Sequence, residues 1–114
     1  MAVETLYIDK IMEKLLELDI YKVILFGFYA EGKADSESDI DLLIVLDDET
    51  LPDNYDQWLE IKMRVRRSLR EINKKAAIDL LVYTKPQYEI IQSDMSSFQK
   101  EIHETGKILY EKAS

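Results

Sequence analysis

Two aspartates stand directly before an apolar run in the segment SDIDLLIV. Asp39 and Asp41 are two positions apart, with Ile40 between them, so both side chains point to the same face if a strand begins near them. Two carboxylates this close repel each other and raise each other's proton affinity unless a cation lies between them. Mg²⁺ is a suitable cation, because it binds a few carboxylates and leaves positions open for phosphate oxygens. The pair therefore predicts a site for a divalent metal ion.

A third acid occupies the equivalent place in a later segment. The sequences DIDLLIV and AIDLLVY share the pattern I-D-L-L, so Asp79 stands in its segment where Asp41 stands in the first. If the two segments are neighbouring strands in the same register, Asp39, Asp41 and Asp79 meet at one end of the sheet. Three carboxylates can hold two metal ions, which stabilise the attacking and leaving oxygens in phosphoryl transfer. The alternative is that these acids only flank strands, since 23 of the 114 residues are acidic.

The elements that must position these acids follow from apolar periodicity and from turn residues. Helical spacing predicts an amphipathic helix near residues 4–18. It also predicts a long helix that begins with an Asp53 N-cap and reaches Ile72. Short apolar runs predict strands at residues 22–27, 40–46, 77–83 and 107–111.

Two shorter helices are predicted nearer the C-terminus. Pro86 suits the first turn of one, and Ser96 with Gln99 resembles a capping box that opens the other. Gly106 is expected to end that second helix. The order of elements predicts an α/β (α+β) fold with a small mixed β-sheet flanked by helices. The length suits a single domain over residues 1–114.

The composition limits the classes of function. The net charge of −8 argues against direct binding of nucleic acid, because a phosphate backbone would be repelled. The absence of cysteine excludes disulfides and thiolate metal sites. No apolar run approaches the length needed to span a membrane, and the N-terminus lacks a signal-peptide pattern, so a cytoplasmic protein is expected.

The glycine turn before the two aspartates completes the pattern of a known family. The chain resembles the minimal nucleotidyltransferases, small members of the DNA-polymerase-β-like nucleotidyltransferase superfamily. Their motif is G-S-x10-D-x-D with a third acid on a later strand. Gly27 stands at the family's glycine and Phe28 at its serine, and ten residues follow. The three acids of the motif correspond to Asp39, Asp41 and Asp79. With the terminal GKILYE, the resemblance extends over nearly the whole chain.

The resemblance implies transfer of a nucleoside monophosphate, AMP from ATP or another nucleotide, to an acceptor. In the family, the turn opens a helix whose backbone N–H groups hold the triphosphate, a role that would fall to Gly27, Phe28 and Tyr29. Asp39 and Asp41 would bind two Mg²⁺ ions. Asp79 would share one ion and help to activate the acceptor hydroxyl.

Small members of this family also imply a partner. They resemble the antitoxin half of a toxin–antitoxin pair whose toxin is an all-helical HEPN-domain RNase. The antitoxin neutralises its partner by adenylylating it or by binding it. A homodimer through the short C-terminal edge strand is a further expectation.

Two residues depart from the family pattern. Phe28 lacks the hydroxyl that the family's serine offers to phosphate, at a cost on the order of 1.5–3 kcal/mol for one charge-assisted contact. Glu31 replaces a basic residue often found before the second glycine. These departures leave open a second function, a non-catalytic module that neutralises a partner by contact alone. A third reading is a small structural protein in which the acids only decorate the surface.

All four arginines fall on the predicted long helix. Lys62, Arg66 and Arg70 recur at every fourth position and form a basic stripe. The stripe is either a solvated face paired with local acids such as Glu71, or a surface for an acidic partner or a triphosphate. The acidic run 47–49 is expected to be a solvated loop.

Overall fold

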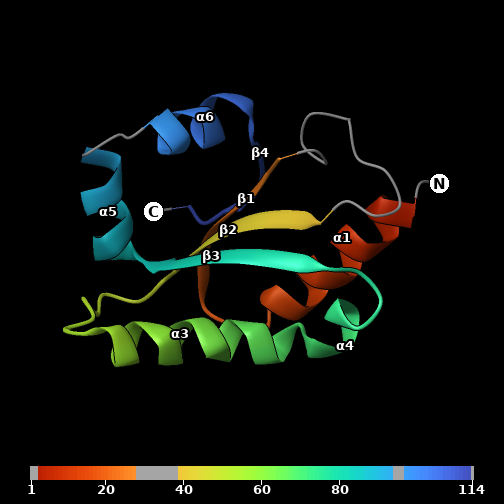
Figure 1. Ribbon diagram of the computed structural model, residues 1–114, viewed down its shortest axis with the longest axis horizontal. Coiled ribbons are helices and arrows are strands. Elements are labelled where there is room, and N and C mark those ends of the chain that lie inside the picture. Colours follow the sequence, from red (N-terminus) through yellow and green to blue (C-terminus); the bar gives the residue numbers. More distant parts are fainter. Residues whose placement is uncertain (1–2, 28–38, 94–96, 114) are drawn as a thin grey trace.

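The protein is built on a four-stranded sheet in the order β3-β2-β1-β4. The computed structural model describes residues 3–27, 39–93 and 97–113 (Figure 1). β1 (Ile20–Phe26) is antiparallel to both β2 (Ile40–Leu46) and β4 (Lys107–Glu111), whereas β2 is parallel to β3 (Ile78–Thr84). The predicted small mixed sheet is therefore confirmed.

The register of the two central strands follows their repeated pattern. In the β2–β3 ladder Asp41 lies opposite Asp79, and the pairing continues without interruption to Leu46 opposite Thr84. Parallel strands of this kind are covered on both faces, which explains why their sequences are nearly continuous apolar runs. The expectation that the two I-D-L-L segments are neighbours in the same register is confirmed.

Helices cover both faces of the sheet (Figure 1). One face packs against α1 (Val3–Leu15), α3 (Tyr55–Ser68) and α4 (Arg70–Asn73), with an apolar core that includes Leu42, Ile44 and Val65. The opposite face packs against α5 (Lys85–Ser93) and α6 (Ser97–Thr105) through a smaller core of five buried residues: Ile24, Leu43, Val45, Tyr88 and Ile102. Alternate residues of β2 thus supply the two cores, as the two-residue period of a strand requires.

The long predicted helix differs from the observed one at its start and near its end. Its N-cap is Asn54 and not Asp53: the Asn54 side chain accepts a hydrogen bond from the Gln57 N–H at 2.9 Å, and the Gln57 side chain accepts from the Asp53 N–H at 2.8 Å. The helix is also interrupted at Leu69, whose φ of −103° and ψ of 9° separate α3 from α4. The apolar spacing continues across this break to Ile72, so periodicity alone does not reveal it.

The other boundaries agree within a few residues. β2 and β4 have the predicted limits, Pro86 lies in the first turn of α5, and Gly106 follows the end of α6, where its N–H donates to the Ile102 carbonyl at 2.8 Å. α1 ends at Leu15, three residues earlier than predicted. Ser96 of the predicted capping box lies outside the described residues. In the portion of the chain that the structure describes, no helix has the length and apolar character needed to cross a membrane.

Candidate functional site

Gly27 and Asp41 are in direct contact at one end of the sheet. Gly27 follows β1 with a φ of +76°, a conformation that glycine adopts readily and other residues adopt at a cost. A Cβ placed on Gly27 would overlap Oδ2 of Asp41 and lie 3.1 Å from its Cγ. The Asp41 carboxylate therefore rests on the bare α-carbon of Gly27, and the first glycine of the turn positions the acid 14 residues later.

Asp41 and Asp79 line the same cavity. They are paired across β2 and β3, so their side chains project to the same face of the sheet, the face that packs against α6. The cavity has a volume of about 300 Å³. Its wall is completed by the end of β1 and by one side of α6, with the residues Phe26, Gly27, Glu101, Ile102 and Thr105.

Burial and neighbouring negative charges both raise the pKa of Asp41. Partial burial raises the pKa of the Asp41 carboxyl above its ordinary value, and the negative charges of Asp79 and then Asp39 raise it further. Asp79 and Asp39 are exposed, whereas Asp41 is half-buried. Asp79 and Asp39 thus lie close enough to Asp41 to raise its pKa, and the structure brings Asp41 and Asp79 into one cavity.

The donor set fits a hard divalent cation. It consists only of carboxylates at an open mouth, the ligand type that Mg²⁺ prefers, and a cation there would relieve the repulsion on Asp41. Across residues 3–27, 39–93 and 97–113, however, no three acidic or histidine side chains are gathered closely enough to hold a metal ion as they stand. Metal binding by Asp39, Asp41 and Asp79 together stays a prediction.

The sequence matches the family described as "Polymerase beta, Nucleotidyltransferase" over residues 8–114. The chain belongs to this nucleotidyltransferase family. The family's fold agrees with the observed mixed sheet and its flanking helices. No curated protein is significantly similar to the chain in sequence.

Solved structures show the same nucleotidyltransferase fold in toxin–antitoxin complexes. A toxin–antitoxin structure with AMP-PNP superposes with a TM-score of 0.60 at 20% identity, covering 91% of this chain and 73% of the other. A tri-AMPylated Shewanella oneidensis HEPN toxin in complex with an MNT antitoxin gives a TM-score of 0.53 at 20% identity, covering 96% of this chain and 74% of the other. A candidate nucleotidyltransferase from Sulfolobus solfataricus gives 0.54 at 16% identity, with coverages of 93% and 75%.

Part of the nucleotidyltransferase motif lies outside the described residues. Phe28, Tyr29 and Glu31 fall there, so their expected roles at a triphosphate stay predictions. Gly27 is the last described residue before this segment and lines the cavity, and its expected role at a triphosphate also stays a prediction.

Residues of α6 also line the cavity that holds Asp41 and Asp79, and the sequence analysis did not predict them. Glu101 and Thr105 are one helical turn apart and face the acids across the cavity. They reach it because α6 ends tightly against β1: a Cβ on Gly106 would lie 2.7 Å from Cγ2 of Ile24. The sequence offers a partial signal, since Gly106 predicts the end of a helix, but nothing in the sequence pairs that helix with the end of β1 next to Gly27.

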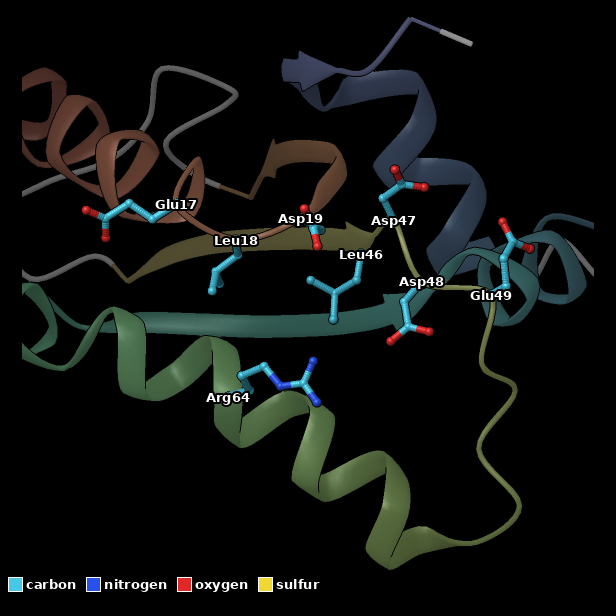
Figure 2. Close-up of a pocket in the computed structure, with 8 residues that line it drawn as sticks. All are labelled: Glu17, Leu18, Asp19, Leu46, Asp47, Asp48, Glu49 and Arg64. Atoms are coloured by element: carbon cyan, nitrogen blue, oxygen red, sulfur yellow. The ribbon is translucent and has the colours of Figure 1, made fainter.

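A second cluster of acids lies at the opposite end of β2. The acidic run was expected to be a solvated loop, but Asp47 and Asp48 are half-buried. Asp47 forms ion pairs with Lys85 at 3.5 Å and with Lys112 at 2.5 Å. Figure 2 shows these acids around a polar cavity of about 490 Å³, with Arg64 extending from α3 toward Asp48. Glu49 also pairs with Lys85, at 3.2 Å, so two of the three acids of the run pair with lysines. These ion pairs hold the loop after β2 to α5 and to the C-terminal end of β4.

Proposed function

We propose that this protein transfers a nucleoside monophosphate, AMP from ATP in the first instance, to a hydroxyl group of a protein acceptor. The observation that carries the proposal is the pairing of Asp41 with Asp79 in one cavity beside a left-handed glycine. Membership of the nucleotidyltransferase family supports nucleotidyl transfer as the chemistry of these paired acids. In the reaction, the acceptor oxygen forms a bond to the α-phosphorus, the bond to the β-phosphate oxygen breaks, and pyrophosphate leaves.

Each acid of the cavity has a proposed role. Asp39 and Asp41 would hold Mg²⁺, and Asp79 would share it and lie nearest the acceptor hydroxyl, whose proton it receives. Bound Mg²⁺ would supply charge stabilisation for the attacking and leaving oxygens. The Gly27 backbone would lie next to the triphosphate, since a residue without a side chain lets a phosphate group approach closely.

We further propose a HEPN-type helical protein as the partner, with this chain as the antitoxin. The support is the likeness of fold to MNT antitoxins solved with HEPN toxins, one of them with AMP-PNP and another with a tri-AMPylated toxin. The cavity that holds the paired acids has a volume of about 300 Å³, so a large acceptor must present its hydroxyl at the mouth of that cavity. A protein that brings its own hydroxyl to the mouth of the cavity meets that requirement.

A catalytically inactive binding module is the second candidate. The feature that favours it is Phe28 at the place of the family's serine, which removes a hydroxyl from the expected triphosphate site. Such a module would still bind the partner but would no longer bind the nucleotide. The predicted homodimer is a separate question: β4 is an edge strand as that prediction requires, but the irregularity opposite Val23 and Ile24 interrupts its ladder and works against strand addition.

Titration with Mg²⁺ and ATP, followed by thermal unfolding, tests the first proposal. If the site works, ATP with Mg²⁺ raises the melting temperature, by an increment that grows with ligand concentration. Asp41→Asn should abolish the shift, whereas Asp9→Asn on the exposed face of α1 should retain it. Label from α-³²P-ATP should then appear on the HEPN-type partner. A melting temperature that ATP and Mg²⁺ leave unchanged, and that Phe28→Ser makes responsive, would overturn the enzyme in favour of the binding module.

A further inference from the structure

Among the described residues, side chains cap the outer edge of β3 near its two ends and none caps its middle. β3 is the edge strand beside α3, and side chains cap three backbone groups that point away from β2. Asn73 Oδ1 accepts a hydrogen bond from the Ile78 N–H at 2.9 Å, and Gln87 Oε1 accepts one from the Thr84 N–H at 3.0 Å. Between them, Trp58 Nε1 donates to the Val82 carbonyl at 3.1 Å. Caps of this kind prevent another strand from adding along the whole edge.

Leu80 lies in the uncapped interval. Backbone groups alternate in direction along a strand, so Leu80 belongs to the same outward-facing series as Ile78 and Val82. Its N–H and C=O therefore lie on the outer edge, between the caps at Ile78 and at Val82. A small cavity of about 90 Å³ opens at this point, with Leu80 and Asp79 on the side of the strand and Lys62 and Arg66 on the side of α3. The interval from Ile78 to Val82 is about 13 Å long, room for roughly three added residues.

The cations beside this interval are not neutralised within the described chain. None of the four arginines forms an ion pair with another described residue. Glu71, the acid expected to pair with the basic stripe, instead pairs with Lys74 at 3.3 Å. Lys62 lies over the Trp58 ring at 5.4 Å, which holds its ammonium group above the edge of β3. In a chain with a net charge of −8, this face is a local basic surface.

We propose that this interval is a docking site for a short, extended, acidic segment of a protein partner. The segment adds to β3 at Leu80, exchanging main-chain hydrogen bonds with its N–H and C=O, and its carboxylates lie on Lys62 and Arg66. Asp79 lines both this cavity and the cavity that holds Asp41, so the bound segment passes beside the paired acids. If the proposed transfer reaction holds, a hydroxyl next to the bound segment is the acceptor. Only this choice of acceptor rests on the proposed function; the docking of the segment does not.

A peptide fits this interval better than a nucleic acid does. An extended peptide offers both a donor and an acceptor at the spacing of a strand, which Leu80 requires, whereas a sugar–phosphate backbone offers no such pair. The cavity is smaller than a triphosphate requires, so the nucleotide is better placed on the other face of β3.

The test uses the full chain, labelled with ¹⁵N, and the peptide acetyl-Glu-Thr-Glu-Thr-Glu-Thr-amide at low salt. Titration should shift the amide signal of Leu80 and the indole signal of Trp58. Arg66→Gln should weaken binding about fivefold, the loss of one charge pair, whereas Arg67→Gln, on the same helix but not in the lining of the cavity, should leave it unchanged. The lysine analogue of the peptide should not bind.

Several results would overturn the docking site. Equal weakening by Arg66→Gln and Arg67→Gln would show nonspecific attraction, and shifts at β4 in place of Leu80 would show a different surface. Tighter binding of a single-stranded oligonucleotide, competing at the same signals, would assign the face to nucleic acid. Mg²⁺ with ATP, titrated into the same samples, separates the two proposals. Loss of the nucleotide response with the peptide response intact contradicts only the enzyme, and the reverse contradicts only the docking site.

Discussion

The carboxylate of Asp41 lies against the α-carbon of Gly27, so the turn after β1 and the acid of β2 form one structural unit. Strand pairing brings them together, because Phe26 is the partner of Asp41 in the β1–β2 ladder. The glycine allows both the left-handed backbone and the close approach of the carboxylate. This contact explains in physical terms why a glycine stands at the beginning of a motif whose acids come much later.

Gly27→Ala should destabilise the protein and displace Asp41. The cost of a φ of +76° for a residue with a side chain, with the overlap on the carboxylate, is about 1–3 kcal/mol in the free energy of unfolding. Urea denaturation measures it. In an Asp41→Ala background the overlap disappears and only the backbone cost remains, so the substitution should then cost less. Equal costs in both backgrounds would show that the contact carries no strain.

The raised pKa of Asp41 predicts a pH dependence of stability. Because its native pKa lies above the ordinary value of 3.8, the native state binds more protons than the unfolded state between the two values. Stability contributed by this group therefore falls as the pH rises through that window and stays reduced at neutral pH. Asp41→Asn should stabilise the protein at pH 7 and flatten this part of the profile, whereas Asp9→Asn should not. Denaturant unfolding at pH values from 4 to about 7 measures the free energy of unfolding of each variant. If the pH dependence of stability in Asp41→Asn equals that of the unsubstituted protein, the prediction is wrong.

The opposite pH dependence of stability is expected for Asp47. Hydrogen bonding from Lys112, and then its charge and that of Lys85, lower the pKa of the Asp47 carboxyl. This group therefore stabilises the native state above its ordinary pKa of 3.8, and the contribution is lost as the pH falls through the lower native value. Asp47→Asn should lower the stability at pH 7, and less so in high salt or below about pH 3. Asp53→Asn is the matched control, and equal effects at pH 7 and in acid would exclude the ion pairs as the cause.

Much of the site could be predicted from sequence because it depends on strand register. The shared I-D-L-L pattern places Asp41 and Asp79 side by side as soon as the two strands are parallel neighbours. The N-cap at Asn54 could also have been predicted, because Gln57 stands three residues after Asn54, whereas it stands four residues after Asp53. That spacing is the signal of a capping box.

Tertiary packing decides what the sequence could not predict. The break at Leu69 lies within a continuous apolar stripe, so no change of period marks it. Glu101 and Thr105 enter the cavity because Gly106 packs against Ile24, and nothing local in either segment encodes that contact. The interval at Leu80 depends partly on tertiary packing, because Asn73 and Gln87 cap β3 from neighbouring segments whereas Trp58 caps it from α3, 24 residues away.

The hydrogen bond between Tyr88 and His103 is predicted to hold α6 over the cavity. The Tyr88 hydroxyl lies 2.5 Å from Nε2 of His103, the rings stack at 5.7 Å, and Tyr88 is only 4% exposed. Tyr88→Phe keeps the ring and removes the hydroxyl, which should lower the free energy of unfolding by about 1 kcal/mol. Tyr55→Phe, at a position that is 66% exposed, is the matched control and should change it little. Because Glu101 and Thr105 lie on the same helix as His103, hydrogen exchange of α6 amides should also accelerate in Tyr88→Phe. Unchanged exchange with lowered global stability would mean that the bond stabilises the fold without fixing α6 over the paired acids.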